Sequence, residues 1–208
     1  MTAARLAATG IVDRHSTMGA LDEPLLLRRH RVSADDYQRM GAAGVLGPEA
    51  RVELIDGEVI DMAPIGSRHW AAVSRIDRLL HKAVRERAIV GTQTSFRLSP
   101  YSEPQPDIAL FKPRDDFYSK ALPTAADALL VIEVADTTAR YDREIKLPLY
   151  ARHGINELWI VDLDANLLRI FTEPRGDDYL RASGHASPGV TAIGALPGAS
   201  VDLSGLFD

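Results

Sequence analysis

The sequence predicts an α+β (mixed α/β) fold in which helices flank a central mixed sheet and a hairpin lies near the N-terminus. Runs that alternate between apolar and polar residues indicate strands, and one long run with helical periodicity indicates a surface helix. With 208 residues, of which 46% are hydrophobic and 25% charged, the chain can bury a sizeable core. We therefore expect residues 31–208 to form a single domain.

Local signals predict the N-terminal elements. Residues 1–30 lack a continuous apolar segment, so we expect a partly disordered lead-in and no signal peptide. A short helix opens at Ser33, with Asp36 at capping-box spacing. The runs RVELI and EVIDM flank Asp56 and Gly57, a pair that tolerates the positive φ angles of a type I′ turn. These runs therefore predict a two-residue hairpin.

A long amphipathic helix is predicted over residues 67–87, with Ser67 as its N-cap. At about 100° per residue its apolar positions share one arc, namely Ala72, Val73, Ile76, Leu79, Leu80 and Ala83. Basic residues share an adjoining arc, namely Arg68, Arg75, Arg78, Lys82 and Arg85. This basic arc is either a solvated helix face or a row of contacts to the backbone phosphates of a nucleic acid.

The second half of the chain predicts further strands. We expect a strand near residues 93–98, one strand around Asp107 and another around Glu133. ELWIVDL and LLRIFTE form a second predicted hairpin. The tail from Glu173 is rich in Gly, Pro and Ser and predicts loops with a short terminal strand.

A helix is predicted between the Glu133 strand and ELWIVDL. Pro148 would remove a donor and clash inside a helix, so the helix is expected to begin near Leu147 and to leave Lys146 at its start. Lys146 and Tyr150 are four residues apart and share one helical face.

Two acidic residues in these strands are the main functional signal. In ALLVIEVAD, Glu133 lies in the middle of a run that is apolar on both faces, and in PQPDIALF, Asp107 follows a proline that starts strands well. A carboxylate in such a place is costly unless a metal or a cation compensates it. If the two strands are neighbours, Asp107 and Glu133 can share one divalent ion, with the backbone carbonyl of Val134 as a further ligand.

This arrangement resembles the PD-(D/E)XK phosphodiesterase superfamily, which has the restriction-endonuclease-like fold. Pro106-Asp107 matches the PD element, and Glu133-Val134-Ala135 matches the second element except that Ala135 stands where lysine is expected. Lys146 matches a variation in which the lysine has moved to the following helix. The chain also resembles the bacterial endonuclease family called Uma-two over about residues 33–207, through VELIDGEVIDMAP, His69, PQPDIAL, LLVIEVADTTARYDREIKLPLYARHGINELWIVDL and LPGASVDLSGLF in that order.

The resemblance implies a restriction-endonuclease-like core and metal-assisted phosphodiester hydrolysis, with DNA as the partner. Asp107 and Glu133 would hold Mg²⁺, for which Mn²⁺ could substitute, and the ion would lower the pKa of a bound water. Lys146 would orient that water or neutralise phosphate oxygens. The family also carries a histidine at His69, which implies an active-site role, and Glu53 is a candidate for a third acidic ligand.

Each of these residues also has a structural interpretation. Asp107 could make an ordinary turn hydrogen bond, Lys146 could be a surface lysine, and Glu53 could face solvent. His69 could be a hydrogen-bonded core residue. Five further residues are expected at the rim of the site, namely Gln105, Asp136, Thr138, Tyr141 and Asp142.

Three functional classes remain open at this point. The first is a Mg²⁺-dependent DNA endonuclease. The second is a non-catalytic member of the fold that binds nucleic acid or a protein partner, because Ala135 replaces the lysine of the motif. The third is a carboxylate-pair hydrolase that acts on sugars. Metal dependence separates the first class from the third, and mutation of Lys146 separates the first from the second.

Composition adds weaker constraints. The net charge of −5 argues against a protein that coats nucleic acid along its whole surface. The chain has no cysteine, which excludes disulfides and thiol chemistry and fits the cytoplasm. We expect no membrane span, and a homodimer is left open.

Overall fold

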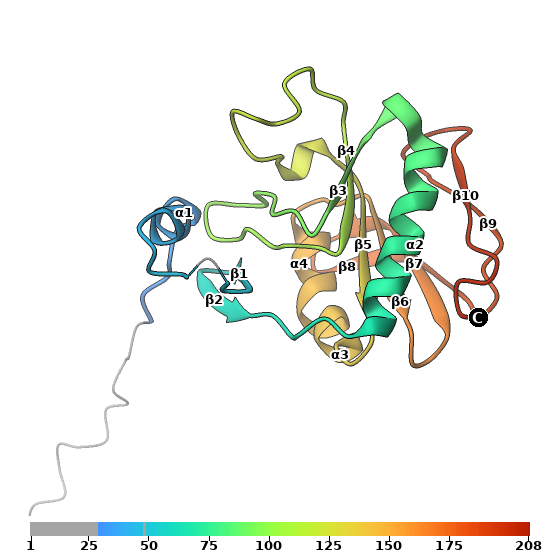
Figure 1. The fold of residues 1–208 in the computed structure, drawn as a ribbon, viewed down its shortest axis with the longest axis horizontal. Coiled ribbons are helices and arrows are strands. Elements are labelled where there is room, and N and C mark those ends of the chain that lie inside the picture. The colour runs from blue at the N-terminus through green and yellow to red at the C-terminus, as the bar shows by residue number, and fades with distance from the viewer. Residues whose placement is uncertain (1–28, 48) are drawn as a thin grey trace, which may run out of the picture. The chain divides into compact units, whose positions relative to one another are not determined.

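The computed structural model describes residues 29–47 and 49–208, so nearly all of the predicted lead-in lies outside the described residues. Residues 31–208 form one compact unit. Its centre is a six-stranded mixed sheet in the order β3-β4-β5-β6-β7-β8, in which only the β5–β6 pair is parallel. The predicted α+β fold with a central mixed sheet flanked by helices is confirmed (Figure 1).

The sheet strands are β3 Ile89–Thr92, β4 Ile108–Phe111, β5 Ala128–Ala135, β6 Glu157–Asp162, β7 Leu167–Arg175 and β8 Asp178–His185. Two further antiparallel pairs are β1 Val52–Ile55 with β2 Glu58–Asp61, and β9 Val190–Ala192 with β10 Ser200–Asp202. The helices are α1 Ala34–Ala42, α2 Ser67–Val84, α3 Ala139–Tyr141 and α4 Leu147–Arg152. Short helical turns cover Arg85–Arg87, Ala125–Asp127 and Asp142–Lys146. Among the described residues, no helix is long and apolar enough to cross a membrane.

Two apolar layers cover the two faces of the sheet, and they follow the predicted period of two. On one face, Ile132 and Val134 pack in the core cluster that contains α2 and the β9–β10 hairpin. On the other face, Val131 packs in the cluster that contains α4. Glu133 shares the parity of Val131, so its side chain projects toward the α4 side.

The predicted N-terminal elements are present with small corrections. The Ser33 side chain accepts from the backbone N–H of Asp36 and caps α1. Asp56 and Gly57 both have positive φ between β1 and β2, as a type I′ turn requires. The N-cap of α2 is Gly66, so the prediction of Ser67 was wrong by one residue.

The C-terminal end of the long helix also differs from the prediction. α2 ends at Val84, because Arg85 adopts a positive φ of 49° and starts a separate 3₁₀ turn that ends at Arg87. The helical segment before β6 matches the prediction only in part. α4 begins at Leu147 with its proline in the first turn, but helical backbone already begins at Ala139 and continues through the π-helical turn, so Lys146 lies inside the segment and not at its start.

The strand predicted near residues 93–98 was wrong. β3 ends at Thr92, and a positive φ at Gln93 turns the chain out of the sheet. Phe96 and Leu98 are buried at alternate positions, but their backbone N–H groups bond to a neighbouring loop, at Pro104 and Ser102. Alternate residues are therefore buried here although the segment does not pair with a strand of the sheet.

The tail prediction was right about a short terminal strand, β10, but wrong about the loops before it. β7 continues to Arg175, and β8 pairs with β7 along most of its length before the β9–β10 hairpin follows. Gly176 takes a positive φ in the turn between β7 and β8. Pairing with a neighbouring strand overrode the loop-like composition of this segment.

Candidate active site

The two predicted carboxylates lie side by side, Glu133 on β5 and Asp107 directly before the adjacent strand β4. β4 and β5 are antiparallel with Ile108 opposite Ile132, which sets Asp107 beside Glu133 at the same end of the pair. Asp107 Oδ2 accepts from the backbone N–H of Val134 at 2.8 Å, and Glu133 Oε2 lies 3.4 Å from the backbone N of Asp107. Each carboxylate therefore lies against the backbone of the other segment, that of Asp107 at Val134 and that of Glu133 at Asp107.

Lys146 reaches the same place from the segment that follows β5. The chain turns through α3 and a π-helical turn, Asp142–Lys146, before α4 begins. The Lys146 ammonium group is buried, 3.1 Å from Glu133 Oε1, and Tyr150 donates its hydroxyl to the same oxygen at 2.6 Å. The shared helical face of Lys146 and Tyr150 thus points at Glu133. Ala135, at the motif position of lysine, is itself fully buried.

Glu53 lies on the other side of Lys146. Its Oε2 is 2.7 Å from Lys146 Nζ, and its Oε1 accepts from the hydroxyl of Tyr141 at 3.1 Å. The backbone N–H of Gln105 also donates to Oε2. Lys146 is therefore held between two buried carboxylates, Glu53 and Glu133, and Glu53 is a partner of the lysine.

His69 joins the site from the first turn of α2. Its Nε2 lies 3.1 Å from Asp107 Oδ1, and this hydrogen bond raises the pKa of the His69 imidazole, which burial opposes. Its Nδ1 is buried and has no partner among the described residues. His69 therefore faces Asp107 and is not packed in the apolar core.

The site holds more acidic side chains than Lys146 alone can neutralise, and the pKa values of its residues show this. Burial raises the pKa of Glu133 to about 8, and repulsion from Asp107 and Asp142 adds to the effect, while the Lys146 ammonium group opposes it. Burial likewise raises the pKa of Asp142 to about 6, although the hydroxyl of Thr138 and Lys146 both stabilise its ionised form. The neighbouring carboxylates raise the pKa of Lys146 against the effect of burial, so it stays charged.

These residues line a cavity of about 350 Å³. Asp107, Glu133, Lys146, Glu53 and His69 all contribute to its wall, together with the backbone neighbour Val134. All five residues expected at the rim also line it, namely Gln105, Asp136, Thr138, Tyr141 and Asp142. The structure thus brings together residues from β1, α2, β4, β5 and the helical segment after β5.

Sequence reasoning missed one wall of this cavity. Arg51, Asp61, the linker from Met62 to Gly66 and Thr137 complete the lining. Arg51 donates from Nη1 to the carbonyl oxygen of Ala63, which fixes its side chain against the linker. No local pattern marks Arg51, because its role depends on how the β1–β2 hairpin lies against the sheet.

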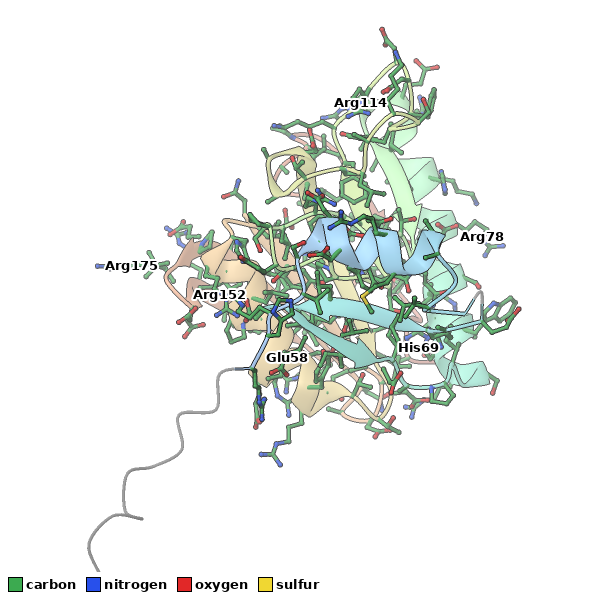
Figure 2. The ribbon with its side chains drawn as sticks, turned by 90° about the vertical axis from the view of Figure 1, so that its left-hand side faces the viewer. Glu58, His69, Arg78, Arg114, Arg152 and Arg175 are labelled. Atoms are coloured by element: carbon green, nitrogen blue, oxygen red, sulfur yellow. The ribbon has the colours of Figure 1, made fainter. Side chains whose placement is uncertain are left out.

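The basic arc of α2 lies outside the cavity. None of its five described members lines the cavity, and Arg68 is paired with Asp136 and Asp164. Arg75 donates to the carbonyl oxygen of Gly205. Figure 2 shows Arg78 extending outward from α2, whereas His69 lies toward the β1–β2 hairpin.

The donor set fits a hard divalent ion with few protein ligands. Among the described residues, no group of three His, Asp or Glu side chains is arranged to hold one ion. Mg²⁺ usually keeps several waters and takes only one or two carboxylates, which matches the Asp107 and Glu133 pair. The excess of acids around Lys146 is the charge pattern that a bound cation would relieve.

Comparison with known proteins shows the family of this chain and agrees with its fold. The family model described as "Uma2: Putative restriction endonuclease" matches residues 34–204, and the chain belongs to this family. The chain is also similar to a solved structure from Anabaena variabilis ATCC 29413, described as a putative nuclease belonging to DUF820. The TM-score is 0.64 at 15% identity, and the match covers 85% of this chain and 97% of that chain. This likeness shows a shared fold. No curated protein matches the chain.

Proposed function

We propose that this protein is a metal-dependent nuclease that hydrolyses phosphodiester bonds in DNA. The observation that carries the proposal is the cavity in which Asp107, Glu133 and Lys146 meet. Membership of a family described as restriction endonucleases supports the same reaction class.

Asp107, Glu133 and the carbonyl group of Val134 would hold Mg²⁺ in this proposal. When bound, the ion supplies a water of lowered pKa and positive charge for the phosphorane-like transition state. Ionised Glu133 is needed for this task, and its ionisation is opposed by burial but favoured by Lys146. His69 Nε2 donates to Asp107 Oδ1 and so fixes the orientation of that carboxylate.

Lys146 provides the fixed positive charge of the site. Its ammonium group is buried between Glu53 and Glu133, so a hydrogen bond and an ion pair hold its position before any substrate arrives. A lysine that reaches Glu133 from the following helix can fill the role that Ala135 leaves open. This contact favours the nuclease over the non-catalytic alternative.

The direct test is cleavage of supercoiled plasmid and labelled oligonucleotides with Mg²⁺ or Mn²⁺, compared with a chelator. Asp107→Asn should slow metal-dependent cleavage by about a hundred- to thousandfold, the usual loss when one transition-state interaction is removed. Asp115→Asn, a change at an exposed acid outside the cavity, is the matched control and should cleave at the native rate. Cleavage that persists in chelator, or equal rates for the two variants, would refute the proposal.

We further propose that the exposed part of the α2 basic arc contacts DNA phosphates. Arg75, Arg78 and Lys82 are exposed on the helix whose first turn carries His69. Changing all three to glutamine should weaken DNA binding and reduce the slope of log K against log salt by about 0.7 to 0.9 per lost contact. A slope that stays constant would leave the arc as a solvated helix face.

A further inference from the structure

The cavity has two chemically different walls. One wall carries the acids and Lys146. The second wall is the linker from Met62 to Gly66, which includes Ala63, Pro64 and Ile65 and is largely apolar. A phosphate and a metal would contact the acids and Lys146. The apolar linker is therefore available to an apolar part of the ligand.

Arg51 stands with the apolar wall and is the cation best able to meet a phosphate. Three described basic side chains line the cavity. Lys146 is paired with Glu53 and Glu133, and His69 is paired with Asp107. Arg51 donates one N–H to Ala63, and a guanidinium group has five, so donors remain for a ligand oxygen.

Trp70 lies at the same end of α2 as the cavity. Its backbone N–H donates to the carbonyl oxygen of Gly66 at 3.0 Å, so it lies one helical turn from a residue of the cavity wall. Trp70 itself is not among the lining residues, but it directly follows the lining residue His69 in the sequence. The side chain of Trp70 is 65% exposed, and that of the wall residue Ile65 is 37% exposed. An exposed tryptophan of this kind is a platform for a nucleobase.

We propose that the substrate enters this cavity as an unpaired nucleotide of a DNA strand, with its base stacked on Trp70 and a flanking phosphate on Arg51. This inference rests on the proposed nuclease function and names its substrate class. A cavity of about 350 Å³ has room for a small ligand such as part of one nucleotide. A base inside a duplex has no free face, so it must leave the stack to reach such a platform.

Tryptophan fluorescence gives a direct test, because the chain has two tryptophans in opposite settings. Trp159 is fully buried and gives a constant background, whereas Trp70 is exposed. The full chain is titrated with a single-stranded oligonucleotide and with its duplex in the presence of Ca²⁺, which takes the same oxygen ligands. The strand should quench the emission of Trp70 and bind about tenfold or more tightly than the duplex, in line with stacking energies.

Variants separate the two contacts. Trp70→Phe should abolish the quenching, and Trp70→Ala should weaken strand binding about five- to hundredfold. Arg51→Gln should weaken strand binding as well, while Arg175→Gln, at an exposed arginine distant from His69 in Figure 2, should bind as the native chain does. Equal quenching in Trp70→Phe, equal affinity for duplex and strand, or equal binding by Arg51→Gln and Arg175→Gln would overturn the inference.

Failure of the inference and failure of the nuclease proposal give different results. Metal-dependent cleavage of duplex DNA without strand binding would overturn the inference alone. Quenching by the strand that depends on Trp70 and Arg51, combined with no metal-dependent cleavage, would overturn the nuclease proposal and keep the unpaired nucleotide as the ligand.

Discussion

Glu133 and Glu157 are two buried acids on the neighbouring parallel strands β5 and β6, yet their surroundings differ. Glu133 faces the α4 side, lines the cavity and contacts Lys146 and Tyr150. Glu157 faces the apolar layer on the other side. Its Oε1 accepts from the indole N–H of Trp159 at 2.8 Å, and its Oε2 accepts from the backbone N–H of Ala195 at 3.3 Å.

The pair shows that burial and a raised pKa do not by themselves identify a functional acid. Burial raises the pKa of both carboxyl groups. At Glu157, hydrogen bonds from fixed N–H donors oppose the effect of burial on the pKa. At Glu133, Lys146 and the hydroxyl of Tyr150 oppose burial, but repulsion from Asp107 and Asp142 raises the pKa further. Glu157 ties the segment before β10 to the sheet. Glu133 is left with unbalanced charge beside a cavity, which is the condition for binding a cation.

The largest expected effect concerns the cation next to Glu133. Lys146→Gln should reduce metal-dependent cleavage about a hundred- to thousandfold, because the buried positive charge is lost while the side chain keeps much of its length. Lys120→Gln, at an exposed lysine on the loop after β4, should leave the rate unchanged. Cleavage rates under single-turnover conditions provide the measurement. If Lys146→Gln cleaves as the native chain does, the lysine has only a structural role.

Metal binding should distinguish the two acids next. Mn²⁺ at a hundredfold excess over its Kd should stabilise the native chain by about 2.7 kcal/mol, which corresponds to a rise in Tm of about 5–10 °C. Glu133→Gln should lose most of this rise, because one ligand is gone. Glu157→Gln should keep it in full. Thermal unfolding with and without the ion, or after its removal by a chelator, measures the effect, and equal shifts in both variants would exclude Glu133 as a ligand.

The same substitution should have opposite effects on the metal-free protein. Glu133→Gln relieves repulsion and keeps an oxygen for Lys146 and Tyr150, so its Tm should equal or exceed the native value. Glu157→Gln places an NH₂ group against Trp159 or Ala195, so it should cost about 1–2 kcal/mol. Urea unfolding of both variants provides the measurement. Two losses of similar size would mean that Glu133 is as well compensated as Glu157.

The smallest expected effect is the pH dependence of the Glu157 contribution. Burial raises the folded-state pKa of Glu157 above its ordinary value of 4.5, so the folded state binds its proton more tightly than the unfolded state. The stability from this group is therefore greatest below that ordinary value and falls as the pH rises through the folded-state pKa. The difference in unfolding free energy between the native chain and Glu157→Gln should shrink over that range. A difference that grows with pH would show that the hydrogen bonds outweigh burial.

Much of the site could be predicted because its acids interrupt regular apolar runs. The alternation in ALLVIEVAD separates the face of Glu133 from that of Ile132, and the structure has these faces in two different core clusters. The spacing of Lys146 and Tyr150 predicted a shared helical face, and both side chains contact Glu133. The likeness of the motifs to a known family supplied their order and their expected roles.

Other features could not be predicted because they depend on segments that are distant in the sequence. Arg51 gains its place in the cavity only through the position of the β1–β2 hairpin. The run around Phe96 mimics a strand, since its alternate residues are buried although its backbone pairs with a loop. β8 is a sheet strand because β7 pairs with it, despite a composition typical of loops.

Local sequence signals were sufficient to predict the turn at Asp56 and the alternating faces of β5, because each depends on steric and hydrogen-bonding preferences within a few residues. Long-range packing determines that Glu133 faces a cavity and that Glu157 is closed in by N–H donors. That distinction depends on the register between strands and on the helix packed over each face, and a sequence pattern does not specify these long-range contacts.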